Sequence, residues 1–257
     1  PSFYTRVLSS KGKKMKDIKL REWEESYERG ENNILYPQEE VVRFLNNYIR
    51  KKLDYSGRFN EVLGLNEQEK LVCLDFACGV GVHSILCEEF GIESFGVDIS
   101  EVAIKKAKFN AKTQGFNDLI DRFIHLEPNN LELPFEENFF NFTIAESCLD
   151  SMYFHTAQQY YKELKRVTKR YIYFSLIGSE SSCYGEEVYD IVVNTDHEKG
   201  TIQSYYDLKR IKSLFEDDFI KLVFLVKKTK LSVLDEANNI SSRFYGLIDL
   251  SKIDYPQ

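Results

Sequence analysis

The segment from Leu71 to Ser100 decides the fold, and it reads LVCLDFACGVGVHSILCEEFGIESFGVDIS. An apolar run over residues 71–76 predicts a buried strand, and residues 94–98 predict a second one. Two glycines, Gly79 and Gly81, stand between the first strand and a stretch with helical character. A strand, a glycine turn, a helix and another strand in this order predict the start of a parallel, doubly wound sheet.

The alternation of strands and helices continues toward the C-terminus. Further strands are predicted over residues 122–126, 140–145 and 171–177, with helices near 156–168 and 207–215. Only a loop separates the last two predicted strands, 220–226 and 243–250, so they are expected to pair antiparallel at the sheet edge. We therefore predict an α/β fold: a doubly wound, mostly parallel seven-stranded sheet with an antiparallel last strand, an N-terminal helical cap and an inserted hairpin.

The chain divides into three parts by composition. Residues 1–20 are polar and basic and predict a flexible leader, and the sequence leaves open whether Met15 is the natural start. Residues 21–69 predict a helical cap, in which Pro37 begins a helix that extends to about Lys52. Residues 70–257 form the main domain, with the hairpin at about 186–206.

Composition excludes several classes of protein. The net charge of −7 and the pI of about 5.3 argue against duplex DNA as the main partner. No stretch approaches the about 20 apolar residues of a membrane helix, and the first residues lack a secretory signal, so a cytoplasmic protein is expected. Five cysteines, an odd number, predict reduced thiols. The spacing of Cys73 and Cys78 does not suit zinc, and we expect no metal site.

The glycine turn and the two acids beside it point to a nucleoside ligand. Glycines allow close approach of the backbone, and the helix start offers free N–H groups to an anionic group. Asp98 ends the second strand and can accept hydrogen bonds from ribose hydroxyls. A dinucleotide-binding fold has a third glycine at the position where this chain has Ser84. In addition, the carboxylate of Asp75 would repel a pyrophosphate. Asp75 instead favours a cationic, amino-acid-bearing nucleoside, or it only orders the loop, and the two roles are compatible.

The segment from Leu71 to Ser100 resembles motifs I and II of the class I S-adenosylmethionine-dependent methyltransferases, in the variant with Ala77-Cys78. The loop over residues 129–135 resembles the adenine-side loop of that family. Residues 142–147 are similar to its motif IV, and residues 242–248 to its last antiparallel strand. The resemblance covers residues 70–250, apart from the hairpin, and implies S-adenosylmethionine as cofactor and S-adenosylhomocysteine as product.

The resemblance also implies roles for single residues. Asp75 and the backbone near Ala77 and Gly79 would hold the methionine amine and carboxylate, and Asp98 would hold the ribose. Either Glu146 or Ser147 would border the exit of the methyl group. The full set of expected cofactor residues is Asp75, Ala77, Cys78, Gly79, Gly81, Asp98, Ile99, Asn129, Asn130 and Glu146. Asn129 stands where many members have an acid.

The acceptor side of the site carries fewer signals. An alcohol acceptor needs a base, whereas a phosphate or carboxylate acceptor is already anionic. His155 follows the fourth strand, in a region that faces the acceptor in this family, so it is the first candidate base, and Tyr153 would orient the acceptor. A histidine that only caps or packs the next helix remains an equal alternative. On the cap and after the fourth strand, the expected substrate contacts are Tyr27, Arg29, Tyr36 and Ser147, although the cap also fits an ordinary amphipathic helix.

These features favour O-methylation of a small polar metabolite. The absence of an Asp/Asn-Pro-Pro-Tyr motif argues against methylation of amines on DNA bases or glutamine. The resemblance suggests a sugar, or a phosphate or phosphoramidate group, in bacterial surface-polysaccharide (capsule) biosynthesis. Three alternatives remain: a protein or peptide methyltransferase, a nicotinamide-dependent dehydrogenase and a non-catalytic scaffold that binds the cofactor. A small-molecule acceptor is the expected partner, without nucleic acid or membrane, and a homodimer is compatible with the sequence.

Overall fold

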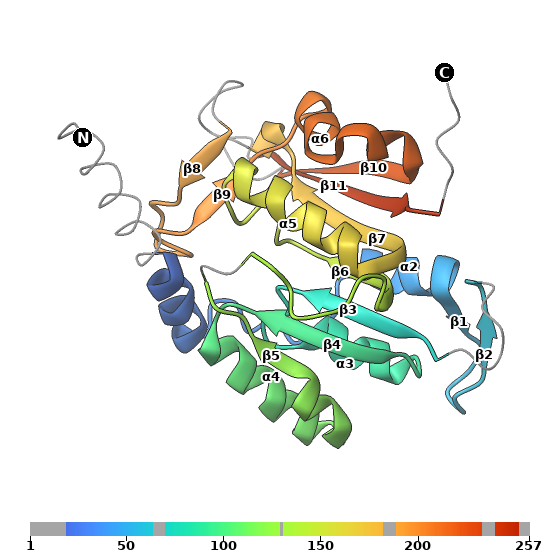
Figure 1. The fold of residues 1–257 in the computed structure, drawn as a ribbon. Coiled ribbons are helices and arrows are strands. Elements are labelled where there is room, and N and C mark those ends of the chain that lie inside the picture. Colours follow the sequence, from blue (N-terminus) through green and yellow to red (C-terminus); the bar gives the residue numbers. More distant parts are fainter. Residues whose placement is uncertain (1–18, 64–69, 129–130, 182–188, 233–239, 252–257) are drawn as a thin grey trace.

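A mixed sheet forms the centre of the molecule (Figure 1). The computed structural model describes residues 19–63, 70–128, 131–181, 189–232 and 240–251. Within them the seven strands follow the order β10-β11-β7-β6-β3-β4-β5. The strands are β3 (Val72–Phe76), β4 (Glu93–Asp98), β5 (Phe123–His125), β6 (Phe140–Ala145), β7 (Thr168–Ile177), β10 (Leu222–Leu231) and β11 (Ile240–Asp249).

The direction of the strands confirms the predicted fold class. The five strands from β7 to β5 pair parallel, whereas β11 pairs antiparallel with both β7 and β10. The chain thus returns through the antiparallel strand β11, which lies between β7 and β10. β6 is buried at every position, as expected for a strand that helices cover on both sides.

Helices pack on both faces of the sheet (Figure 1). On one face lie α5 (Phe154–Val167) and α6 (Leu208–Phe215), against the apolar side chains of β6 and β7. On the other lie α2 (Glu39–Phe44) and α3 (Val82–Glu89). α4 (Glu101–Thr113) packs with the short helix η2 (Asn117–Arg122) against β5. Successive residues of β3, Cys73 and Leu74, belong to the two opposite cores, which is the period of two that a strand imposes.

The segment predicted as a purely helical cap also contains strands. Residues 19–29 are helical, and a π-helical turn, η1 (Leu45–Ile49), continues α2. The helix then ends earlier than the predicted Lys52, because β1 (Arg50–Lys52) pairs antiparallel with β2 (Phe59–Glu61). Arg50 closes this small sheet by an ion pair with Glu61 at 2.7 Å. Most of the predicted leader, residues 1–18, lies outside the described residues.

The inserted hairpin is present as predicted. β8 (Asp190–Val192) pairs antiparallel with β9 (Ile202–Ser204). It leaves the sheet after β7 and the short helix η3 (Ser179–Ser181), and the chain re-enters the main fold through α6. The last short helix, η4 (Glu216–Lys221), precedes β10. Among the described residues, none of the helices has both the length and the apolar character needed to cross a bilayer.

Candidate active site

The strand order places the candidate site between β3 and β6. From β3 the chain builds the sheet toward β5 in one direction, and from β6 it builds toward β7 in the other. In open α/β sheets, ligands bind outside the carboxyl ends of the strands where the order reverses in this way. Asp75 of β3 is paired in register with Ile144 of β6, so the loops after these two strands leave the sheet side by side.

Left-handed backbone marks both of these loops. Ala77 after β3 has φ 57°, and Ser147 after β6 has φ 53°. Non-glycine residues uncommonly adopt this conformation, and those that do are enriched in turns and at active sites. Gly79 and Gly81 continue the first loop with φ 53° and 82°, and Gly81 is the N-cap residue of α3. Any side chain at Gly81 would collide with Phe123, because an added Cβ would lie 2.7 Å from its ring.

The two acids predicted from the sequence hold this loop. Asp75 is 2% exposed, and its Oδ2 accepts hydrogen bonds from the Ser84 amide at 2.9 Å and the Ser84 hydroxyl at 2.7 Å. Asp98 accepts from the Gly79 amide at 2.9 Å through Oδ2 and from the Ser100 amide at 2.9 Å through Oδ1. The predicted role of Asp75 in ordering the loop is therefore present, and Asp98 joins the loop to the end of β4.

Burial disfavours the charged form of both acids. It raises the pKa of Asp75 to about 6, against the hydrogen bonds from Ser84. It also raises the pKa of Asp98 to about 6, with the charges of Asp75 and Glu24 adding to the effect. Among the described residues, no cationic side chain forms an ion pair with either acid. A ligand that carries an ammonium or sulfonium group would supply the missing charge, so these residues suit the cofactor that the sequence implies.

The N-terminal helix, residues 19–29, lies over this edge of the sheet. Glu24 caps α4: its carboxylate accepts from the Glu101 amide at 2.7 Å, the Val102 amide at 3.0 Å and the Ser100 hydroxyl at 3.0 Å. One turn later, the Tyr27 hydroxyl lies beside Gly79, 2.8 Å from the position that a Cβ on this residue would take. The helix thus reaches from the start of α4 to the glycine loop.

The same helix is held to the inserted hairpin. Glu22 packs on Gly200, since an added Cβ there would lie 2.6 Å from Glu22 Cγ. The Glu198 amide donates to Glu31 Oε2 at 3.3 Å, just beyond the helix. Lys19 lies over the Tyr153 ring at 3.5 Å, at the start of α5. The N-terminal helix therefore connects α4, the hairpin and α5 above the carboxyl ends of the strands.

A second polar cluster follows β6. Glu146 is 9% exposed, and its Oε1 accepts from the Ser147 hydroxyl at 3.0 Å. The Ser147 amide donates to Ser175 Oγ at 3.0 Å, and Ser175 also accepts from Arg243 at 3.1 Å. Arg243 pairs with the buried Asp150 at 2.8 Å. The cluster links the loop after β6 to β7 and β11.

His83 lies at the start of α3, and its charge interacts with that of Glu146 in this cluster. The ring is 8% exposed, and its Nε2 accepts from the Gln38 amide at 3.3 Å. Burial lowers the pKa of His83, and the charge of Glu146 acts in the opposite direction. The ring is therefore neutral near pH 7, with its proton on Nδ1.

The structure separates the predicted acceptor residues. Tyr27 reaches the glycine loop, but Tyr36 is 83% exposed. Arg29 is exposed and hydrogen-bonds Glu31 at 2.6 Å. His155 is exposed in the first turn of α5, with its ring centre 5.9 Å from that of the half-buried Tyr153.

Two of the predicted cofactor residues, Asn129 and Asn130, lie outside the described residues. Cys78 is buried, and its amide donates to the Val97 carbonyl at 3.0 Å. Ile99 is half-buried at the start of the connection to α4, with its carbonyl 2.9 Å from His125 Nε2. These residues keep the ends of β3, β4 and β5 together.

The sequence reasoning missed Glu24, His83 and the pair Asp150–Arg243. Glu24 acts on residues 76 to 78 positions away, and Asp150 and Arg243 are 93 positions apart. Contacts between residues so far apart in the chain leave no local pattern in the sequence. A signal existed only for His83, because it lies in the glycine-loop segment that carried the family resemblance.

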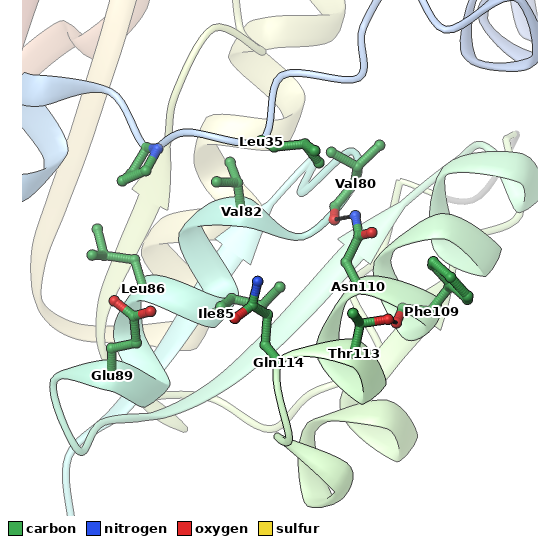
Figure 2. Close-up of a pocket in the computed structure, with 11 residues that line it drawn as sticks. Leu35, Val80, Val82, Ile85, Leu86, Glu89, Phe109, Asn110, Thr113 and Gln114 are labelled. Atoms are coloured by element: carbon green, nitrogen blue, oxygen red, sulfur yellow. Dashed lines mark hydrogen bonds between the residues drawn. The ribbon is translucent and has the colours of Figure 1, made fainter.

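A cavity of about 330 Å³ lies on the outer side of the glycine loop, between α3 and α4 (Figure 2). Its lining is mainly apolar, with Leu35, Val80 and Phe109 among the residues, and Asn110 donates to the Val80 carbonyl at 3.0 Å beside it. Neither Asp75 nor Asp98 lines this cavity. It is therefore separate from the edge between β3 and β6.

Known proteins resemble this chain in sequence and in fold. A family model described as "Methyltransferase domain" matches residues 67–216. An uncharacterised protein of Haemophilus influenzae is 32% identical over 108 residues, which are 41% of each chain. A SAM-dependent methyltransferase of Methanosarcina mazei matches with a TM-score of 0.55 and 22% identity, over 71% of this chain and 93% of that one.

A further solved structure shares the fold. The geranyl diphosphate C-methyltransferase of Streptomyces coelicolor, in complex with Mg²⁺, geranyl diphosphate and S-adenosylhomocysteine, matches with a TM-score of 0.50 and 14% identity, over 73% of each chain. The family match covers more than half of the chain and includes the glycine loop, both acids and the loop after β6. The chain therefore belongs to the class I S-adenosylmethionine-dependent methyltransferases, enzymes whose methyl donor is S-adenosylmethionine.

Proposed function

We propose that this methyltransferase O-methylates a small polar metabolite, such as a sugar or a phosphate or phosphoramidate group used in bacterial surface-polysaccharide biosynthesis. The observation that carries the proposal is the cover over the site. The helix of residues 19–29 and the β8–β9 hairpin meet above the strand ends, where Glu22 packs on Gly200. Such a cover suits an acceptor that fits beneath it rather than a large polymer that lies across the surface.

The cofactor end of the site follows from the two acids and the glycine loop. S-adenosylmethionine supplies a methyl group on a positively charged sulfur. We propose that Asp98 holds the ribose hydroxyls, with Ile99 against the adenine. Asp75, with the backbone at Ala77 and Gly79, would hold the amino-acid portion. In each case the family resemblance implies the role, and the buried position of the acids supports it.

The acceptor end is proposed to lie beneath the N-terminal helix. Tyr27 places its hydroxyl above Gly79, and Tyr153 lies under Lys19 at the opposite end of the cover. Both are half-buried, so each can present a hydroxyl to an acceptor. His155, the base that the sequence suggested, is exposed, and bulk water would compete with the acceptor for its ring nitrogens.

Relatives in fold support a small acceptor. One solved structure of similar fold is a geranyl diphosphate methyltransferase in complex with its acceptor and sinefungin, at a TM-score of 0.53 and 14% identity. Membership of the methyltransferase family removes the dehydrogenase alternative. A peptide acceptor is the second candidate: among the described residues β8 pairs only with β9, and an extended peptide could pair with its other edge.

The test is a labelled-methyl assay with two acceptor pools. Purified enzyme and S-adenosyl-[³H-methyl]methionine are incubated with a bacterial extract separated by size into metabolites and polypeptides. We expect label in the metabolite pool and none above background in the polypeptide pool. Label that appears only in polypeptides would replace the proposal with the peptide alternative. Calorimetry with S-adenosylhomocysteine and NADH checks that the enzyme used is competent, since only the first should bind.

A further inference from the structure

The cavity between α3 and α4 has the size and the lining of a small-molecule site (Figure 2). Two large apolar side chains stand exposed beside it, since Leu35 is 63% exposed and Phe109 is 69% exposed. Single exposed apolar residues are ordinary on a protein surface, but apolar residues gathered around a hollow mark binding sites. The volume of about 330 Å³ falls within the range of about 300–1,000 Å³ that small-molecule sites occupy.

The apolar part of the wall comes from α3 and from the segment that precedes α2. Val82, Ile85 and Leu86 follow one another at the spacing of three and four residues that places side chains on one face of a helix. Leu35 and Pro37 come from the segment between the N-terminal helix and α2. Removing an apolar body from water against these side chains is favourable, so we expect most of the ligand to be a carbon skeleton.

The polar groups of the wall mainly offer acceptors to a ligand. The Asn110 amide nitrogen already donates to the Val80 carbonyl at 3.0 Å, and the Thr113 hydroxyl already donates to the Phe109 carbonyl at 2.9 Å. Glu89 is exposed at the cavity, and its carboxylate forms no ion pair within the described ranges. A carboxylate only accepts hydrogen bonds when it is charged. The polar end of the ligand is therefore expected to be a hydrogen-bond donor.

One end of the cavity favours a positive charge. α3 and α4 follow the parallel strands β3 and β4, so the two helices run in the same direction. α3 ends at Glu89, and α4 ends at Thr113 with Gln114 as its C-cap residue, and all three line the cavity. The carbonyls at a helix C-terminus carry partial negative charge, to which the Glu89 carboxylate adds. The last turn of α3 has no basic residue, and Lys112 in that of α4 is exposed and does not line the cavity.

We propose that this cavity is a second ligand site of the enzyme and that it binds a small apolar amine. The aromatic or aliphatic body of the amine lies against α3 and the segment of residues 35–37, and its ammonium group lies at the C-terminal ends of α3 and α4. Neither Asp75 nor Asp98 lines the cavity, so the amine binds while the cofactor is in place. The site does not depend on which acceptor the enzyme methylates.

The first experiment compares three probes that differ only at their polar end. 3-Phenylpropylamine, 3-phenylpropan-1-ol and 3-phenylpropanoate are titrated into the full chain with labelled methyl groups, and binding is followed by NMR. S-adenosylhomocysteine is present at saturation, so that the acids Asp75 and Asp98 do not attract the amine. We expect the amine to shift the methyl signals of Val82 and Ile85 with a dissociation constant below about 1 mM. The alcohol should bind about threefold more weakly or worse, and the carboxylate more weakly still.

Three results of this titration would overturn the proposal. The cavity would not be an amine site if the amine, at about ten times the expected dissociation constant, left the Val82 and Ile85 methyl signals in place. Binding of the carboxylate as tightly as the amine would contradict the preference for a positive charge. Shifts of the same methyl signals when the enzyme alone is concentrated would assign the cavity to a second copy of the chain.

The second experiment removes the charge at the polar end of the cavity. Glu89→Gln keeps the size of the side chain, and we expect the amine to bind about threefold more weakly while the affinity for the alcohol stays within about twofold. The matched control is Glu101→Gln, an exposed acid in the first turn of α4 that pairs with Lys105 at 2.9 Å. It should change neither affinity. Equal binding of the amine by Glu89→Gln and the wild type would contradict the position of the ammonium group.

The third experiment fills the cavity from the surface. Thr113 is exposed at the end of α4 and lines the cavity, so Thr113→Trp places a large side chain there without changing the core. We expect the amine to bind about tenfold more weakly or worse, because the ring takes the space of the ligand. Lys112→Trp introduces the same side chain at the neighbouring exposed position outside the lining and should bind the amine like the wild type. Both variants should keep the affinity for S-adenosylhomocysteine, and unchanged amine binding in Thr113→Trp would place the amine elsewhere and refute the site.

Discussion

The carboxylate of Asp98 holds the glycine loop by a hydrogen bond and is also expected to bind the ligand. It accepts one hydrogen bond from the Gly79 amide and one from the Ser100 amide, which leaves further lone pairs for ribose hydroxyls. We predict that Asp98→Ala weakens S-adenosylhomocysteine binding by about 1.5–3 kcal/mol for each hydrogen bond lost. Calorimetry measures the change, and Glu101→Ala, an exposed acid three residues further along, is the control. Equal affinity in Asp98→Ala and wild type would remove Asp98 from the site.

The raised pKa values of Asp75 and Asp98, each about 6, predict a pH dependence of binding. Below pH 6 both carboxyls become neutral, so Asp75 no longer attracts the ammonium group of the ligand and Asp98 accepts more weakly from the ribose hydroxyls. The affinity for S-adenosylhomocysteine should therefore rise from pH 5 to pH 7, by up to about tenfold for each acid, and level off above pH 7. Calorimetry at several pH values checks this. The Asp98→Asn variant should show a shallower rise, and a flat profile for the wild type would contradict the prediction.

Stability should change in the opposite direction over the same range. The folded-state pKa of each acid lies above the usual 3.8, so the folded protein binds more protons than the unfolded chain between about pH 4 and pH 6. The contribution of these acids to the free energy of unfolding is therefore greatest below pH 4 and is lost as the pH rises through 6. Without ligand, the two buried acids therefore lower the stability of the folded enzyme above pH 6, where both are charged.

At the residue scale, the sequence predicted the positions of residues that a local pattern determines. Asp75 and Asp98 each end an apolar run next to a glycine loop or a helix start, and both lie where expected. The surroundings of Glu146 had no such signal, because they depend on which groups β7, β11 and α3 bring near it. Whether a buried acid is paired is decided by tertiary packing, which a single sequence does not display.

The helix of residues 19–29 is attached to α4 mainly by one side chain. Glu24 supplies hydrogen bonds to two amides and one hydroxyl at the N-terminus of α4, and Lys106 adds a bond to the Tyr27 carbonyl. We predict that Glu24→Ala destabilises the protein by about 0.5–2 kcal/mol, the usual cost of a lost helix cap. It should also shift the fluorescence of Trp23, the only tryptophan of the chain, toward that of an exposed indole.

Glu28 provides the matched control for this helix, because it is an acid one turn away that is exposed to solvent. Glu28→Ala should leave both the stability and the Trp23 emission unchanged. If both variants behaved alike, the helix would be held by its apolar face rather than by the Glu24 cap.

At the element scale, strongly patterned segments were predictable and weakly patterned ones were not. β6 is an uninterrupted buried strand, and its predicted bounds, 140–145, agree with the structure. β1 is Arg-Lys-Lys, which has neither apolar character nor alternation, and it follows directly on a helical turn. Its pairing with β2 rests on backbone hydrogen bonds and the Arg50–Glu61 ion pair, so the helix was predicted to run through it.

The whole molecule joins distant parts of the chain at one place. The N-terminal helix, the glycine loop, the start of α4 and the β8–β9 hairpin contact one another above the sheet, through Tyr27, Glu24 and Glu22. The sequence placed the ligand at the glycine turn, and the strand order of the structure reverses beside that turn. The cover over that place was suggested by resemblance, and its contacts came only from the structure.

This arrangement predicts that ligand binding stabilises the cover and the loop together. S-adenosylhomocysteine at 100 times its dissociation constant should stabilise the protein by about 2.7 kcal/mol, and the melting temperature should rise accordingly. In hydrogen exchange, the ligand should slow the amides of residues 19–31, 75–84 and 190–204 in parallel, because Glu22, Glu24 and Tyr27 tie these segments to one helix. In Glu24→Ala, protection of 75–84 should persist while that of 19–31 is reduced. Protection of the glycine loop alone in the wild type would mean that the helix and hairpin close independently of the ligand, and the cover would then have no part in selecting the acceptor.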